Sequence, residues 1–194
     1  MKFIKVATLT LLFAIIAVAS SAQQLNNGDN VASVGIGFGT ALGSGLGSAS
    51  PGFAFQFEHG NWDIDGPGTI SLGGYLGYQS YSYSTSYFIN PNTYNYDYNS
   101  SYTVLGIRSA YHYHGLDMKN LDVYGGLMLS FNFYNSTYKS NYTGVYTPLG
   151  LNGSSRFFPS IYLGTRYYFN DNWGVYGELG YGVAYLTLGA AYHF

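Results

Sequence analysis

The sequence predicts an all-β fold, an eight-stranded antiparallel up-and-down transmembrane β-barrel. Apolar residues recur at every second position in eight separate segments, as they do when one face of a strand meets lipid and the other a lumen. The composition is 47% hydrophobic and 20% aromatic but only 8% charged, against about 25% charged in an ordinary soluble domain. After the first 22 residues, no segment reaches the ~18 consecutive apolar residues of a membrane-spanning helix. An aqueous globule, a disordered chain and a helix bundle all fit this sequence poorly.

The first 22 residues have the layout of a secretory signal peptide. Lys2 and Lys5 precede an apolar run over residues 6–19, and small side chains follow at 20–22. A membrane anchor is the alternative, but about 14 residues make roughly 21 Å of helix, short of a ~30 Å hydrocarbon core. We therefore expect cleavage after residue 22 and a single barrel domain over 23–194. Cleavage changes the formal charge from −2 to −4, because it removes two lysines and no acid.

The composition also excludes several kinds of site. The chain has no Cys, so it has no disulfide scaffold, thiolate metal site or cysteine nucleophile. The cations that remain after cleavage are scattered rather than clustered, which argues against a nucleic-acid partner.

Each expected strand has an apolar row directed at lipid and a small or polar row directed at the lumen. The expected lipid-facing residues are, in chain order, Val34, Ile36 and Phe38; Phe53, Phe55 and Phe57; Ile70, Leu72, Leu76 and Tyr78; Leu105, Ile107, Tyr111 and Tyr113; Leu121, Val123, Leu127, Leu129, Phe131 and Phe133; Phe157, Ile161, Leu163, Tyr167 and Phe169; Trp173, Val175, Leu179, Tyr181 and Val183; and Leu186, Leu188, Ala190, Tyr192 and Phe194. Because hydrocarbon offers no hydrogen-bond partner to a free strand edge, the first and last strands must pair. Pro159 interrupts its strand, and we expect it near a loop end, where a missing donor costs least.

The connections alternate in length, which predicts the orientation of the barrel. Three short joins carry Gly, Pro, Asp and Asn and are typical of periplasmic turns: 59–68, 114–120 and 170–172. Three long joins are rich in Gly, Ser, Tyr and Asn and are expected outside the cell: 41–52, 82–100 and 135–154. A fourth outer join, near residues 182–184, is tight. An even number of strands places both ends of the domain on the periplasmic side.

Several fragments resemble a known family when they are taken together in order. They are 57–60, 105–108, 111–112, 122–126, 164–169 and 173–182, followed by the alternating apolar residues that end at Tyr192 and Phe194. This set resembles the small outer-membrane barrels of the OmpA/OmpX-like, porin-family type. The resemblance implies a place in the outer membrane of a Gram-negative bacterium, contact with its lipid, and recognition of Tyr192 and Phe194 by the barrel-assembly machinery. Unlike the two-domain members, the sequence stops at Phe194, so a role in tethering the cell wall is not expected.

Ionisable side chains fall on the expected lumen faces: Glu58, Arg108, Arg166 and Glu178, with His112 near the periplasmic end of its strand. The interior of an eight-stranded barrel is about wide enough for side chains alone, so these groups must pair with one another. We expect one lumen network, braced by Tyr75, Tyr124, Tyr162 and Tyr176 and with Arg166 diagonal to Glu178. The favoured interpretation is that the network only satisfies polar groups inside a filled barrel. The alternative is that its pairs rearrange to open a narrow water path.

The histidines carry no expected chemistry. His59, His112, His114 and His193 all lie near the periplasmic rim, and His112 and His114 have a spacing that can ligate metal. Ordinary hydrogen bonds at the rim are the favoured interpretation, so no metal or cofactor is expected. The expected outer joins contain no His that could serve as a base for a surface nucleophile, so no enzymatic activity is expected.

Residues 78–102 alternate tyrosine with small polar residues well beyond the length that a membrane crossing needs. We expect the two strands to continue outward and to present Tyr81, Tyr83, Tyr87, Tyr94, Tyr96 and Tyr98 to the medium. Tyrosine offers a large amphipathic contact area at low entropic cost, which favours adhesion to an extracellular protein or glycan. The other interpretation is that these side chains stabilise cross-strand pairs and the upper aromatic girdle.

Three functions are consistent with these features. The first is a monomeric outer-membrane barrel with a filled lumen and a structural, surface-exposed role. The alternative is a narrow porin for small solutes. The third is a secreted, water-soluble coat protein, in which the rows of Leu, Ile and Phe would face one another in a sandwich core.

Overall fold

The computed structural model describes residues 24–39, 48–89, 91–116, 118–141 and 154–194. The expected signal peptide and its cleavage site lie outside these ranges. Within them the chain forms nine strands and no helix: β1 (Asn30–Phe38), β2 (Ser48–Ala49), β3 (Gly52–Ile64), β4 (Gly68–Ile89), β5 (Asn92–Tyr113), β6 (Leu121–Ser140), β7 (Arg156–Tyr168), β8 (Trp173–Gly180) and β9 (Leu186–His193).

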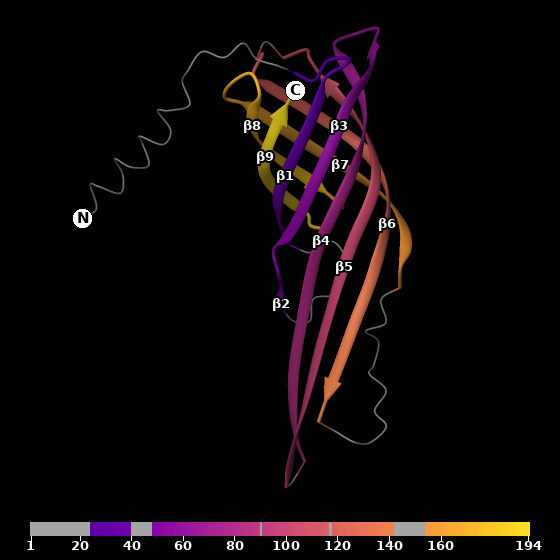
Figure 1. The fold of residues 1–194 in the computed structure, drawn as a ribbon, viewed down its shortest axis with the longest axis vertical. Helices are drawn as coiled ribbons and strands as arrows, with labels where there is room; N and C mark the ends of the chain where they lie inside the picture. The colour runs from indigo at the N-terminus through magenta and orange to yellow at the C-terminus, as the bar shows by residue number, and fades with distance from the viewer. Residues whose placement is uncertain (1–23, 40–47, 90, 117, 142–153) are drawn as a thin grey trace, which may run out of the picture.

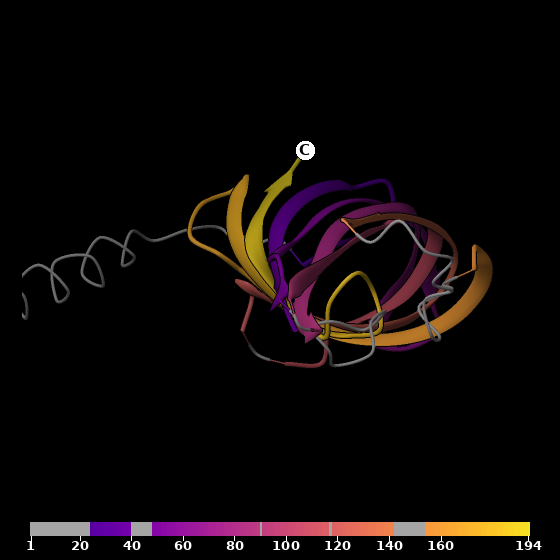
Figure 2. The same ribbon diagram turned by 90° about the horizontal axis from the view of Figure 1, so that it is seen from below.

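The sheet closes on itself as an up-and-down barrel. Apart from the two-residue β2, which pairs only with β4, each strand pairs with its neighbours along the chain. β1 pairs antiparallel with β3 on one side and with β9 on the other, so the first and last strands close the ring. Figures 1 and 2 show this arrangement from the side and from below. The structure confirms the predicted fold of eight antiparallel strands, with β2 as a small addition.

No helix in the described ranges has the length and apolar character that crossing a bilayer requires.

The two faces of the wall differ as the alternation predicts. Ile107 is 69% exposed on the outer face of β5, whereas Val104, three positions away on the inner face, is 1% exposed. The same contrast separates Leu127 from Met128 on β6. Because the rows of Leu, Ile and Phe point away from one another around a closed ring, the sandwich core of a water-soluble coat protein is excluded.

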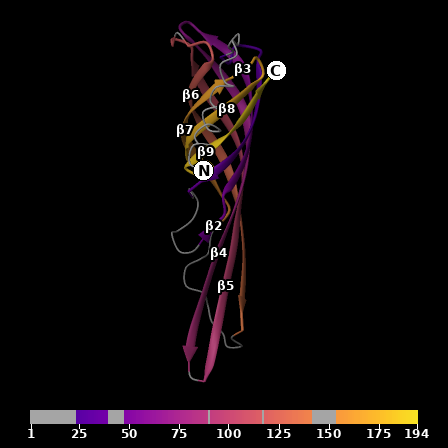
Figure 3. The ribbon, with the colours of Figure 1, turned by 90° about the vertical axis from the view of Figure 1, so that its left-hand side faces the viewer.

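The strands have very unequal lengths at one end. β4 and β5 have 22 residues each and β6 has 20, whereas β8 and β9 have 8 each. The three long strands therefore extend beyond the barrel as a blade, seen at the bottom of Figures 1 and 3. The start of β1 and the end of β9 lie at the opposite end, beside the short turns. Residues 41–47 and 142–153, within two of the expected outer joins, lie outside the described part of the chain.

The predicted join at 59–68 is mostly strand. β3 continues to Ile64, and its pairing with β4 shifts between Gly60 and Trp62. Asn61 is the extra residue of this β-bulge, and its side-chain oxygen accepts a hydrogen bond from the backbone N–H of Leu72 at 3.0 Å. One extra residue exchanges the two faces of the strand, so Trp62 faces outward although it has the parity of the lumen row.

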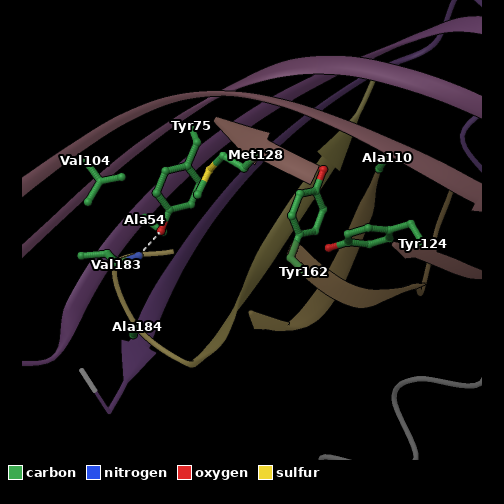
Figure 4. Packing of buried hydrophobic residues seen from close by; sticks show 9 residues of the cluster. All are labelled: Ala54, Tyr75, Val104, Ala110, Tyr124, Met128, Tyr162, Val183 and Ala184. Atoms are coloured by element: carbon green, nitrogen blue, oxygen red, sulfur yellow. Dashed lines mark hydrogen bonds between the residues drawn. The ribbon is translucent and has the colours of Figure 1, made fainter. Parts of the chain in front are cut away.

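Two predicted side-chain orientations in the turn between β8 and β9 are wrong. Val183, expected to face lipid, is fully buried. Tyr185, which alternates with the lipid-facing row that begins at Leu186 and was therefore expected to face the lumen, is exposed. Residues 181–185 fold inward over the barrel, and the N–H of Val183 donates to the hydroxyl of Tyr75 at 3.0 Å. Figure 4 shows this hydrogen bond beside Ala54, Ala184 and Met128. The alternation of a strand does not extend into a turn, which explains the error.

Pro159 lies where its missing N–H is tolerated. It stands opposite Leu129 of β6, and the pairing of β7 with β8 begins only at Tyr162. Residues 156–161 are therefore an edge segment at the outer end of β7. Proline is confined to such edges in sheets, as the sequence predicted.

Candidate functional site

The lumen contains a network of buried ions contributed by β3, β5, β7 and β8. Arg108 binds Glu178 through both terminal nitrogens, with Nη2–Oε2 and Nη1–Oε1 distances of 2.7 and 3.3 Å. Its Nε lies 3.1 Å from Glu58 Oε1, and Arg166 binds the other oxygen of Glu58. The structure thus brings together the four residues that the alternation placed on lumen faces, and all four are buried.

Asp122 of β6 joins this network and is absent from the predicted set. It accepts a hydrogen bond from Arg166 Nη1 at 3.2 Å. Gly164 does stand opposite Glu178, but the ion-pair partners of Arg166 are Glu58 and Asp122 rather than Glu178. Asp122 lies between Leu121 and Val123, so the alternation along β6 contains the signal that would have found it.

His112 extends the network to the end of the lumen beside the short turns. Its Nδ1 lies 2.9 and 3.0 Å from the two carboxylate oxygens of Asp122, so Nδ1 carries the proton. Its Nε2 lies 3.0 Å from the hydroxyl of Ser71. Ser, His and Asp are thus aligned as in a nucleophilic relay, but all three are completely buried. The hydroxyl of Ser71 is therefore not exposed to the medium, and its partner in this arrangement is His112.

Two of the four predicted tyrosines hold the ions directly. Tyr162 places its ring under the Arg108 guanidinium, 3.9 Å from the ring centre, and its hydroxyl accepts from Arg108 Nε at 3.2 Å. Tyr124 donates to Glu178 Oε2 at 3.2 Å, and its ring lies 4.3 Å from the Arg166 guanidinium. Figure 4 shows these two rings side by side. Tyr75 instead bonds the β8–β9 turn, and Tyr176 packs in a separate buried cluster with Leu25.

A strap formed by residues 24–29 crosses the mouth of the barrel at the end with the short turns, and the sequence pattern did not reveal it. Gly28 and Asp29 bond the backbone of Gly60 on β3, while Gln24 Nε2 reaches the carbonyl oxygen of Leu121 at the start of β6, 3.3 Å away. Between these anchors Leu25 points into the lumen, fully buried against Val31, Tyr176 and Ala191. The strap therefore closes the barrel at this end.

The four histidines take part in separate contacts. His59 Nδ1 lies 3.0 Å from the side-chain oxygen of Asn30, and His114 Nε2 lies 3.1 Å from the carbonyl oxygen of Leu25. His193 Nε2 is 3.2 Å from Asp29. His114 lies beyond the end of β5, so it does not join His112 on a strand face. Among the described residues, no cluster of three or more His, Asp or Glu side chains has the arrangement of a metal site.

The tyrosines of the blade share one face, which continues the lumen face of the barrel. On β4, Tyr81 and Tyr83 follow the buried Tyr75 and Gln79 at even spacing. Cross-strand pairing sets Tyr83 opposite Tyr98 and Tyr98 opposite Tyr138, with Tyr102 opposite Tyr134 on the same side. Ring centres are 4.9 Å apart in the 98–138 and 102–134 pairs. We call this surface of β4, β5 and β6 the tyrosine face.

The predicted tyrosines are less exposed than the sequence suggested. Tyr96 is only 7% exposed, and its ring stacks on Tyr138 at 6.2 Å. Tyr81, Tyr83, Tyr94 and Tyr98 are half-buried. Tyr87 stands opposite Tyr94 in the register, and its side chain lies outside what the structure describes. The reverse face of the blade carries Ser, Thr and Asn, together with Asp97 opposite Lys139.

The last residues of the chain face outward at the end with the short turns. Tyr192 and Phe194 stack with ring centres 5.9 Å apart, and both are exposed. The backbone N–H and C=O of Phe194 pair with those of Asn30, at 2.9 and 3.0 Å, which extends the β1–β9 seam.

The chain has likenesses among solved structures. The N-terminal β-barrel domain of Pseudomonas aeruginosa OprF is 14% identical, with a TM-score of 0.43 over 88% of this chain and 100% of that one. Ail, the attachment invasion locus protein of Yersinia pestis, in complex with the heparin analogue sucrose octasulfate, is 10% identical, with a TM-score of 0.44 over 87% and 99%. The outer membrane protein Ail in a phospholipid bilayer nanodisc is 11% identical, with a TM-score of 0.42 over 87% and 100%.

The chain is similar to small outer-membrane β-barrels. No family model matches the sequence, and none of the curated proteins matches it.

Proposed function

We propose that this protein is an integral outer-membrane barrel with a closed lumen, which acts at the cell surface through its blade. The apolar outer face of the barrel carries the membrane proposal. Exposed Leu, Ile, Val and Phe side chains occupy outward positions on all eight strands of the barrel wall. Water disfavours so large an apolar surface, whereas the hydrocarbon of a bilayer accommodates it.

Aromatic side chains flank this apolar band, which supports the same proposal. Trp173 and Tyr192 pack together at the periplasmic end, with ring centres 4.8 Å apart. Phe131, Phe133 and Phe157 cluster toward the other end, with ring centres 4.8 and 4.9 Å apart. Aromatic girdles at both interfaces are typical of outer-membrane barrels. The orientation follows from the short turns, which face the periplasm, and the blade, which extends outside the cell.

The contents of the lumen favour a barrel that does not conduct. The ion network fills the middle, Leu25 closes the periplasmic mouth and Val183 lies under the opposite turn. We therefore expect no stable conductance steps when the purified protein is inserted into a planar bilayer. The same sample should migrate differently on a detergent gel before and after boiling, because the folded barrel resists unheated detergent. Stable steps from such heat-modifiable protein would instead favour a narrow porin.

Assembly is proposed to depend on the C-terminal strand. Tyr192 and Phe194 are exposed in alternation on the outer face, where the barrel-assembly machinery would read them. The ring closes within one chain through the β1–β9 pairing, and this supports a monomer.

The tyrosine face is the proposed contact surface for an extracellular protein or glycan. In the described strands β4, β5 and β6, the residue positions of this face include tyrosine, serine and threonine but no Asp, Glu, Lys, Arg or His. Phenol rings combine apolar area with a hydroxyl that donates and accepts hydrogen bonds, and their ordering costs little entropy. The face stands on three long strands beyond the barrel, within reach of a surface outside the cell (Figure 3).

The two faces of the blade provide a matched test. One variant replaces Tyr83, Tyr94 and Tyr98 with Ser. Its control replaces Ser84, Asn95 and Asn99 with Ala on the reverse face. Cells that display each protein are tested for attachment to wells coated with gelatin and to wells coated with a neutral glucan.

We expect the tyrosine variant to lose attachment to at least one coating and the control to keep it. If both variants, confirmed as heat-modifiable, attach like the parent protein, the tyrosines only stabilise cross-strand pairs.

A further inference from the structure

Two neighbouring strands of the blade carry nearly the same five-residue motif. Residues 98–102 of β5 read Tyr-Asn-Ser-Ser-Tyr, and residues 134–138 of β6 read Tyr-Asn-Ser-Thr-Tyr. The antiparallel register sets the two motifs directly against each other, with Tyr98 opposite Tyr138, Ser100 opposite Ser136 and Tyr102 opposite Tyr134. These side chains share the tyrosine face. The motifs therefore form two tyrosine pairs separated by a pair of small side chains.

The rings within each pair are in close contact. Ring centres are 4.9 Å apart in both pairs, with interplanar angles of 42° and 45°. By comparison, Tyr98 lies 6.2 Å from Tyr83, and Tyr138 lies 6.2 Å from Tyr96. At the shorter separation the edges of two tilted rings touch. The ring carbons next to the hydroxyl groups can then meet through side-chain rotation alone, without a change in the register of the strands.

The medium reaches these phenols, and the backbone holds each one beside its partner. Tyr138 is 36% exposed, and Tyr98, Tyr102 and Tyr134 are half-buried. The blade that carries them extends beyond the barrel (Figure 3). Because strand pairing fixes the two rings in position, a reaction between them is intramolecular and proceeds at a very high effective concentration. A reactive ring therefore meets its partner before it meets a second molecule.

We propose that these two tyrosine pairs are an oxidative cross-linking site, at which dityrosine joins β5 to β6. Each phenol loses one electron and one proton, and the two resulting radicals form a carbon–carbon bond between ring carbons next to the hydroxyl groups. The hydrogen atom on each of these carbons then moves to the oxygen, which restores both phenols. The oxidant is hydrogen peroxide, activated by a haem peroxidase, and one peroxide is reduced to two waters for each bond formed.

The links strengthen the blade where its sheet has fewest neighbours. The pairing of β6 with β7 stops at Asn132 and Arg156, so from Phe133 to Ser140 the partner of β6 among the described strands is β5 alone. Such segments are the first to open in local unfolding. A covalent link across each tyrosine pair keeps β6 on β5. This role depends on the ring contacts and requires neither the membrane location nor attachment to a protein or glycan.

The cross-links can be measured on the full-length protein in detergent micelles. Heat-modifiable protein is treated with hydrogen peroxide and a haem peroxidase, digested with pepsin and analysed by mass spectrometry. We expect the monomer to lose two hydrogen atoms per link, to gain the fluorescence of dityrosine, and to yield linked peptides that join 98 to 138 and 102 to 134. Protein boiled before the treatment should lose this selectivity, because its strands are no longer paired.

Conservative variants assign each link to its pair. Tyr98→Phe should remove the 98–138 link and keep the other, and Tyr134→Phe should do the reverse, because phenylalanine has no phenolic hydrogen to lose. Tyr113→Phe is the control. Tyr113 is 39% exposed on the barrel wall, opposite Gly68 and Val123 rather than a tyrosine, so this variant should keep both links.

Three results would overturn the proposal. The first is a monomer that is oxidised by the peroxidase without forming dityrosine. The second is a set of links that is the same in folded and boiled protein. The third is a Tyr98→Phe variant that forms as much β5–β6 linkage as the parent protein.

Discussion

Glu178 shows how a single buried carboxylate is satisfied inside this barrel. It accepts two hydrogen bonds from Arg108, one from the hydroxyl of Tyr124 and a longer one from Gln56 at 3.4 Å. An unpaired ion at this depth would cost several kcal/mol. Arg108 and Glu178 therefore neutralise each other, and either one alone would be an unpaired buried charge.

Glu178→Gln should lower the free energy of unfolding by about 3 kcal/mol, because it leaves Arg108 buried with one fewer counter-charge. Urea unfolding of the barrel in lipid vesicles measures the change. Asp65→Asn, in the exposed turn before β4, is the control and should leave the midpoint unchanged. Equal midpoints for Glu178→Gln and the parent protein would show that Glu178 has no important ionic partner.

Much of the lumen network could be predicted at the scale of residues, because alternation alone assigns a face to each side chain. Glu58, Arg108, Arg166 and Glu178 were placed correctly on lumen faces for this reason. The choice of partners was not predictable. Arg166 contacts Glu58, more than a hundred residues away in sequence, because the curvature of the closed ring brings β3 opposite β7.

The strap over residues 24–29 is the element least visible in the sequence. A segment that crosses the mouth has no periodic row of apolar residues, and Leu25 is its only large hydrophobic side chain. Its fit depends on Gly60, since a Cβ at that position would collide with the carbonyl oxygen of Asn26. The absence of a side chain at Gly60 therefore leaves room for the strap to pack against β3.

Gly60→Ala should detach the strap while the barrel stays closed. The amide of Gly28, which donates to the carbonyl of Gly60 at 2.9 Å, should then exchange its proton faster by at least about tenfold. Gly74→Ala is the matched control, because the nearest atom to a Cβ there is 4.0 Å away. Hydrogen exchange read by NMR or mass spectrometry distinguishes the two variants, and an unchanged Gly28 rate in Gly60→Ala would show that the contact is unimportant.

The errors at the element scale occur where the two-residue period is interrupted. The Asn61 bulge exchanges the faces of β3, so its last residues were assigned to a turn rather than to a strand. The inward fold of residues 181–185 moves Val183 into the lumen. Both features involve a local change of backbone path, which a pattern of side-chain polarity does not encode.

At the scale of the whole molecule, no sequence motif predicts that the ring closes. The prediction comes from the hydrocarbon of a bilayer, which acts as the solvent of the barrel wall. Hydrocarbon leaves a strand edge without partners, so β1 and β9 had to meet. The long alternation of tyrosines predicted that β4 and β5 extend beyond the barrel, but not that β6 extends with them to Ser140. The single tyrosine face of the blade was not predictable, because that face depends on the register of β4 against β5 and of β5 against β6.

The most direct test of the membrane location measures which side chains of β5 contact acyl chains. The chain has no Cys, so single cysteines at Val104, Leu105, Ile107, Ala110 and Tyr111 can each carry one nitroxide spin label in lipid vesicles. Oxygen, which concentrates in the bilayer, should relax the labels at 105, 107 and 111 strongly, and a water-soluble nickel chelate should not. Labels at 104 and 110 should be shielded from both reagents. A chelate that reaches positions 105 and 107, or a response that does not alternate along the strand, would contradict a barrel with its apolar face in lipid.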